Sequence, residues 1–173
     1  MLDWNFDPHR LVWRMKIDEG FREKAIFDTA HGSSQSQWTN GYGTKAKHIH
    51  ESITKEEASK RLTHALDNAI SYYLNHFNLT VDKMNKVRAE AFINMIFNLG
   101  YGGFKKFEKM NLALSKEEIN WMVVAREAKD SRWYYQVGCR AERLVLELAS
   151  GLYYYTDREI QTLKPVEYFS ETI

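Results

Sequence analysis

The segment from residue 82 to residue 99 reads DKMNKVRAEAFINMIFNL and carries the clearest helical pattern of this chain. Its apolar residues recur every three or four positions, so they share one face of a helix. Gly100 follows, and glycine commonly ends a helix. The density of apolar residues predicts that this segment is the central core helix.

Start signals and apolar stripes predict five further helices around this core. Asp7 and Pro8 mark the start of the first, and capping boxes mark starts at Thr54 and Ser115. The expected helices span residues 8–19, 54 to about 73 or beyond, 115–129, 131–135 and 139–150.

Residues 21–50 lack a helical period and are rich in glycine and serine, which predicts short strands and turns. We therefore expect one domain over residues 1–173, of the mostly helical α+β class. In it, 21–50 form a small β lobe, 8–19 and 54–156 form a larger helical lobe, and 157–173 form a C-terminal extension. The long helix from residue 54 would join the two lobes.

Composition narrows the class of protein. The chain has 173 residues, 44% of them hydrophobic, which is enough for a core. Its 24 basic and 23 acidic residues balance, so we expect no nucleic acid partner. Long apolar runs are absent from the sequence, and the first ten residues include Asp3 and Asp7, so we expect neither membrane insertion nor a secretory signal.

The single cysteine, Cys139, excludes an internal disulfide, and we expect a buried thiol at a helix start.

Three residues suggest acid–base chemistry on a glycosidic bond. Glu19 ends the first helix, where the helix dipole disfavours a charged carboxylate and suits a proton donor. Asp28 and Thr39 follow in the β region, where a carboxylate and a hydroxyl could together hold and activate a water molecule. Position alone favours an exposed helix-end residue for Glu19 and leaves Asp28 open between a turn and a functional residue. The combination points to hydrolysis of a sugar polymer.

Other candidate sites are weaker. His48 and His50 alternate in a basic loop without carboxylates or cysteine at ligand spacing, so we expect no metal site. Cys139 has no base near it in the sequence that could activate a thiol. Phe97 falls off the main apolar face of the 82–99 helix and could reach a cleft.

Five ordered blocks of the chain resemble the bacteriophage-type lysozymes, glycoside hydrolase family 24, which include the T-even phage lysozyme and the lambdoid endolysins. The resemblance covers roughly residues 12–156. The blocks are IDEGFREKAIFDT (17–29), WTNGYG (38–43), ITKEEASKRL (53–62), RAEAFINMIFNLG (88–100) and SRWYYQVGCRAER (131–143). The resemblance implies a two-lobed lysozyme-like fold.

The resemblance also implies roles for individual residues. Glu19 would be the general acid, Asp28 would face or activate the attacking water, and Thr39 would help to hold that water. Phe97 would line the sugar cleft.

Two ion pairs follow from the same resemblance. Arg140 would pair with Glu19, and Arg143 would pair with Asp18. Such pairs would orient the end of the first helix and would oppose a rise in the pKa of the acid.

The chain departs from the family pattern in two places that bear on function. Ten residues, 29–38, separate Asp28 from Thr39, more than the family commonly has, and the polar insert within them predicts an exposed loop at the cleft rim. Both ends of the chain extend beyond the usual family limits, which suggests a contact surface for a phage partner.

The implied activity is hydrolysis of the β-1,4 bond between N-acetylmuramic acid and N-acetylglucosamine in bacterial peptidoglycan. Inversion would require carboxyl groups about 6.5–9.5 Å apart. We expect a monomer without cofactor that is made in the host cytoplasm and reaches the cell wall after release or from the virion. The alternatives are a non-catalytic wall-binding or structural phage protein and a lytic transglycosylase.

Overall fold

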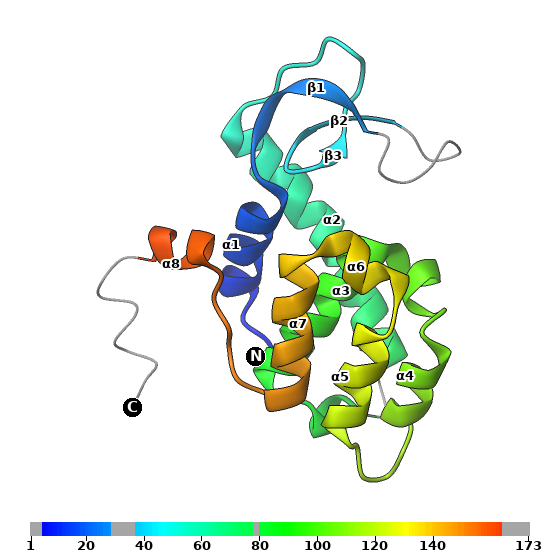
Figure 1. The fold of residues 1–173 in the computed structure, drawn as a ribbon. Helices are drawn as coiled ribbons and strands as arrows, with labels where there is room; N and C mark the ends of the chain where they lie inside the picture. Colours follow the sequence, from blue (N-terminus) through cyan, green and yellow to red (C-terminus); the bar gives the residue numbers. More distant parts are fainter. Residues whose placement is uncertain (1–4, 29–36, 78–79, 164–173) are drawn as a thin grey trace.

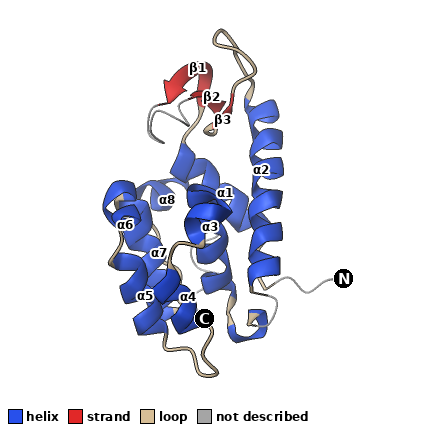
Figure 2. Ribbon diagram, turned by 90° about the vertical axis from the view of Figure 1, so that its right-hand side faces the viewer, coloured by secondary structure: helices blue, strands red, loops and turns tan. Residues whose placement is uncertain are grey.

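The computed structural model of the protein describes residues 5–28, 37–77 and 80–163. A small sheet stands at one end of the molecule and a body of helices at the other (Figure 1). Turning the molecule shows α2, Lys55–His76, running from the sheet along the helical body (Figure 2). The predicted class, mostly helical α+β, is confirmed.

Among the described residues the chain forms eight α-helices and one short 3-10 helix. Besides α2 these are α1 (Pro8–Glu19), η1 (Val81–Lys83), α3 (Lys86–Phe104), α4 (Glu108–Leu114), α5 (Trp121–Lys129), α6 (Arg132–Val137), α7 (Cys139–Ser150) and α8 (Asp157–Thr162). None of them is long and apolar enough to cross a membrane.

The sheet has three antiparallel strands in the order β1-β2-β3. They are β1 (Arg22–Asp28), β2 (Gln37–Gly41) and β3 (Thr44–Lys45). An irregularity between Arg22 and Ile26 interrupts the pairing of β1 with β2, and such irregularities bend a strand. The loop expected at residues 29–38 is shorter than predicted, because Gln37 and Trp38 belong to β2; residues 29–36 lie outside the described residues.

The first helix begins and ends as predicted. The Asp7 carboxylate accepts hydrogen bonds from the backbone N–H groups of His9 and Arg10, at 2.9 and 3.2 Å. Gly20 follows the helix with φ 65°, a backbone conformation that glycine adopts without strain. The chain therefore turns sharply into β1 directly after Glu19.

The predicted connecting helix is present and ends at His76. Thr54 accepts a hydrogen bond from the N–H of Glu57 at 3.2 Å, which caps the helix start. Leu62, Leu66 and Tyr73 are buried along one face. The helix contacts α1, α3, β2 and β3, so it links the sheet to the helical body.

The central helix starts later than its pattern predicts. Asn85 caps α3 by accepting from the N–H of Arg88 at 3.1 Å, and residues Val81–Lys83 form the separate turn η1. At the other end Gly100, with φ 68° and ψ 156°, interrupts the helical backbone. Residues 89–96 between these limits are all buried, as expected of a core helix.

The prediction of a helix start at Ser115 is wrong. Ser115 instead ends α4, a helix that the sequence pattern did not indicate, because its N–H donates to the carbonyl of Asn111. The next helix, α5, begins at Trp121, where Asn120 accepts from the N–H of Val123 at 3.2 Å. A capping-box spacing thus occurs here at the end of one helix.

The last predicted helix is present as α7, but the prediction of a buried thiol is wrong. Cys139 is exposed. Ala141, Leu144 and Leu148 face the core, and the helical period leaves Cys139 on the solvent side.

A further short helix, α8, lies in the stretch expected to be a C-terminal extension. Thr156 and Glu159 form a reciprocal capping box at its start. The side chain of Glu159 is fully buried, so this part of the stretch belongs to the packed body. Residues 164–173 lie outside the described residues.

Candidate active site

Glu19 lies at the junction of the sheet and the helical body. Its carboxylate Oε1 is 2.6 Å from Nη1 of Arg140, on α7. On its other side the turn before β3 passes closely, because a Cβ added to Gly43 would lie 3.0 Å from Glu19 Oε2. Gly43 also has φ 72°, so the turn needs glycine for both its backbone and its contact with the carboxylate.

Asp18 is the centre of a cluster of charges beneath Glu19. Arg143 holds it with two hydrogen bonds of 3.0 and 2.8 Å, and Arg140 Nε lies 3.3 Å from its Oδ2. Asn94 donates to Asp18 at 3.1 Å and accepts from Arg140 at 2.8 Å. Burial opposes ionisation of Asp18, but the two guanidinium groups outweigh burial and lower its pKa. Both ion pairs implied by the family resemblance are thus formed in the structure.

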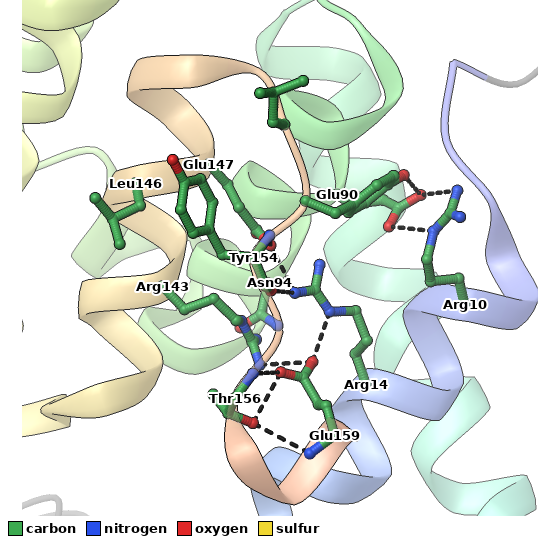
Figure 3. Close-up of polar contacts among 12 residues, drawn as sticks. Arg10, Arg14, Glu90, Asn94, Arg143, Leu146, Glu147, Tyr154, Thr156 and Glu159 are labelled. Atoms are coloured by element: carbon green, nitrogen blue, oxygen red, sulfur yellow. Dashed lines mark hydrogen bonds and ion pairs between the residues drawn. The ribbon is translucent and has the colours of Figure 1, made fainter. Parts of the chain in front are cut away.

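The same cluster continues into a buried network that joins α1, α7 and α8 (Figure 3). Arg143 Nη1 donates to Glu159 Oε1 at 2.9 Å, and Arg14 Nε donates to the same oxygen at 2.7 Å. Arg14 Nη2 also donates to Glu147 Oε1 at 2.6 Å. Asp18 is therefore connected through Arg143 to a carboxylate of the last described helix.

Sequence reasoning missed Arg14, Glu147 and Glu159. A signal was present, since Arg14 stands three residues after Leu11 and Glu147 three residues after Leu144, on the apolar faces of their helices. Two opposite charges on facing apolar stripes are typical of a buried ion pair.

Asp28 and Thr39 share one face of the sheet. Ile26 pairs with Thr39, and Asp28 lies two residues after Ile26 along the strand. This register makes Asp28 and Thr39 diagonal neighbours, roughly 7–8 Å apart. Thr39 is buried and Asp28 is half-buried.

A cavity of about 770 Å³ opens beside Glu19. Its walls come from the turn before β3 and β3 itself, from α2 between Glu57 and Tyr72, and from α3 between Ile96 and Tyr101. Glu19 and the half-buried Phe97 both line it, whereas Asp28 and Thr39 are not among the lining residues.

The chemistry available at this cavity is that of side chains. Glu19 and Glu57 each offer a carboxyl group at its wall, and the other lining side chains are cationic, hydroxyl, imidazole, amide, aromatic and aliphatic. The described residues contain no cluster of three or more His, Cys, Asp or Glu residues that could hold a metal ion. A cavity with a carboxyl group at its wall suits acid catalysis on a bound polymer.

Fold and cavity define a class: a small sheet and a helical body joined by a long helix, with a carboxyl group at the end of the first helix. The family model for phage lysozyme matches residues 16–147. The chain belongs to the phage lysozyme family, which confirms the resemblance noted in the sequence.

Two relatives illustrate how far the similarity extends. Probable T4-type lysozyme 1 of Dictyostelium discoideum is 35% identical over 68 residues, which are 39% of this chain and 39% of that protein. Pre-baseplate central spike protein Gp5 of Enterobacteria phage T4 is 30% identical over 102 residues, 58% of this chain and 17% of that protein. The matched regions span less than half of the length of either relative.

Proposed function

We propose that this protein is a muramidase that hydrolyses the β-1,4 bond between N-acetylmuramic acid and N-acetylglucosamine in bacterial peptidoglycan. Membership of the phage lysozyme family supports a wall-degrading activity. The observation that carries the proposal is the carboxyl group of Glu19 at the wall of a large cavity that Phe97 also lines.

Glu19 would act as the general acid and protonate the leaving oxygen of the glycosidic bond. Arg140 binds one of its oxygens, and the backbone of Gly43 passes close to the other, which restricts the rotamers of the carboxyl group. A proton donor with a fixed orientation speeds the reaction, because less conformational freedom is lost on reaching the transition state.

Asp28 would assist the attacking water, and Thr39 would help to position it. Their shared face and diagonal placement support this pairing. If the reaction inverts the anomeric carbon, the carboxyl groups of Glu19 and Asp28 must be about 6.5–9.5 Å apart with substrate bound. Both proton transfers are then carried by side chains, and no cofactor is required.

Mass analysis of digested peptidoglycan tests the proposal. Purified sacculi are incubated with the protein, and the released fragments are examined for their sugar ends. Hydrolysis leaves reducing ends on N-acetylmuramic acid, whereas a lytic transglycosylase would leave anhydro ends. Proton NMR of the first product anomer separates inversion from retention.

A second candidate is a non-catalytic wall-binding component of a phage particle, with a phage partner bound through the terminal segments. The similarity to a pre-baseplate central spike protein favours this candidate. It predicts sedimentation with sacculi and no release of fragments. A muramidase should release fragments from the sacculi. We also expect the protein to be a monomer in sedimentation equilibrium.

A further inference from the structure

Two tyrosines lie against each other at the end of the cavity formed by α2 and α3. Tyr72 is on α2 and Tyr101 follows the break at Gly100, and both line the cavity. Their ring centroids are 4.7 Å apart and their planes differ by 2°. The rings are therefore stacked face to face.

The position of Tyr101 is fixed by its neighbours. Its hydroxyl is 3.4 Å from Nδ1 of His76, whose Nε2 is 3.0 Å from Oδ1 of Asn111. The ammonium group of Lys105 lies 5.4 Å from the Tyr101 ring centroid. Tyr101 is held before any ligand arrives, which lowers the entropy cost of binding.

Tyr72 differs from the core aromatics by its exposure. Its side chain is 44% exposed, whereas Phe77, Phe92 and Phe104, which also contact one another, are buried. A large aromatic ring at a cavity wall is an apolar surface available to a ligand. Packing the core does not require it to face the cavity.

The stacked pair is remote from the scissile position. The cavity follows α2 from Glu57 to Tyr72, a distance of about 22 Å at 1.5 Å per residue. Glu19 lies against Gly43, in the turn that leads into β3, whereas Tyr72 is the last residue of α2 that lines the cavity. A ligand that touches both must extend over several sugar rings.

We infer that Tyr72 and Tyr101 form a distal saccharide subsite in which the apolar face of a pyranose ring stacks on Tyr72. This inference rests on the proposed muramidase function and adds a requirement for a long glycan. Stacking suits sugars because the ring C–H groups carry partial positive charge and the aromatic face is negative.

Glycan affinity as a function of chain length tests the inference. The background is Glu19→Gln, so that bound glycan is not cleaved, and the probes are peptide-free peptidoglycan glycans of one disaccharide and of several disaccharides. Adding Tyr72→Ala should weaken binding of the long glycan roughly 3- to 10-fold. Binding of the single disaccharide should not change.

Matched variants separate stacking from general damage. Tyr72→Phe keeps the aromatic ring and should bind the long glycan with the affinity of the background. Tyr72→Leu keeps apolar volume but has no aromatic face, so it should bind the long glycan more weakly. Tyr135→Ala removes a tyrosine that is 77% exposed on α6 and does not line the cavity, and it should leave affinity unchanged. Melting temperatures of all variants exclude unfolding.

The outcomes distinguish the subsite from the function on which it rests. Long and short glycans weakened equally by Tyr72→Ala, or no weakening of either, would overturn the subsite and leave the muramidase intact. If the Glu19→Gln background binds no glycan and the parent releases no fragments, the proposed function fails and the subsite fails with it.

Discussion

At the scale of single residues, the candidate site depends on how Glu19 is confined. One of its oxygens meets Arg140 at 2.6 Å, and the other faces Gly43, where even a Cβ would be 3.0 Å away. One oxygen of the carboxyl group thus meets a guanidinium group, and the other meets a backbone segment without a side chain. Its orientation is set by tertiary contacts and not by the helix that carries it.

Glu19→Gln should reduce wall lysis by about 100- to 10,000-fold, because the amide keeps the shape and cannot donate the required proton. The rate of turbidity loss of sacculi measures this effect. Glu142→Gln, the same change at an exposed position of α7, is the matched control. Parental lysis by the Glu19 variant would remove Glu19 from the mechanism.

Asp28→Asn should also lower the turnover number strongly, since the amide accepts no proton from water. Asp67→Asn, at an exposed position of α2, controls for the loss of one charge. The measurement is the rate of new reducing ends at saturating substrate. Unchanged turnover in the Asp28 variant would rule out its role as a base.

Gly43→Ala should impair both stability and activity. The new Cβ would lie 3.0 Å from Glu19 Oε2, and the backbone φ of 72° strains any residue with a side chain. We expect a loss of about 1–3 kcal/mol in the free energy of unfolding and a fall in the turnover number. Gly102→Ala, in α3, where an added Cβ meets nothing within 4 Å, should leave turnover unchanged and stabilise the protein slightly, because alanine favours a helix more than glycine does. Equal losses from the two changes would refute this account of Gly43.

At the scale of elements, the small sheet depends on its attachment to α2. Glu51, in the segment between β3 and α2, accepts from Arg61 Nη2 at 2.6 Å, from the N–H of Lys47 at 2.7 Å and from Asn40 at 3.1 Å. One carboxylate therefore connects β2, the segment after β3 and α2. Three short strands alone would bury too little surface to be stable.

This attachment should weaken in acid. The hydrogen bond from Arg61 lowers the pKa of Glu51 from 4.5 to about 2. Because the folded pKa lies below the unfolded one, the stabilisation is present above pH 4.5 and is lost as the pH falls towards about 2. Chemical unfolding should show the parent to be more stable than Glu51→Gln near neutral pH, with the difference shrinking through this window. Glu118→Gln, at an exposed position, is the matched control for the loss of one carboxylate.

At the scale of the whole molecule, the buried charges join the two ends of the chain. Arg14 and Arg143 both contact Glu159, and Arg143 also contacts Asp18, which precedes Glu19. The last described helix therefore restrains the end of the first helix. Burial opposes ionisation of Glu159, but Arg14 and Arg143 outweigh burial and lower its pKa. Glu159 therefore carries a negative charge that balances the buried guanidinium groups.

Glu159→Ala should destabilise the protein by about 3–5 kcal/mol, because two buried guanidinium groups lose a partner. Urea unfolding measures this loss. Turnover at a temperature where the variant is still folded should also fall, because Arg143, which holds Asp18, loses a fixed partner. Gln161→Ala, at an exposed position of the same helix, is the control; a loss below about 1 kcal/mol for Glu159→Ala would contradict the role of the network.

Sequence by itself determined most of the elements and the family. Apolar periodicity and local caps are encoded within a few residues, so the first helix, the helix from residue 54 and the helix from Cys139 follow the prediction. The motif around Glu19 likewise sits in one short segment, and the match to phage lysozyme over residues 16–147 agrees with it.

Tertiary structure alone decided what depends on distant partners. The spacing at Ser115 looks like a helix start, yet its N–H is used to end α4. Cys139 is exposed because other residues, among them Ala141 and Leu144, form the buried face of α7. Arg14 and Glu159 are 145 positions apart and Tyr72 and Tyr101 are 29 apart along the chain. Their contacts depend on the packing of whole helices, and such packing is not encoded in the local pattern around either residue.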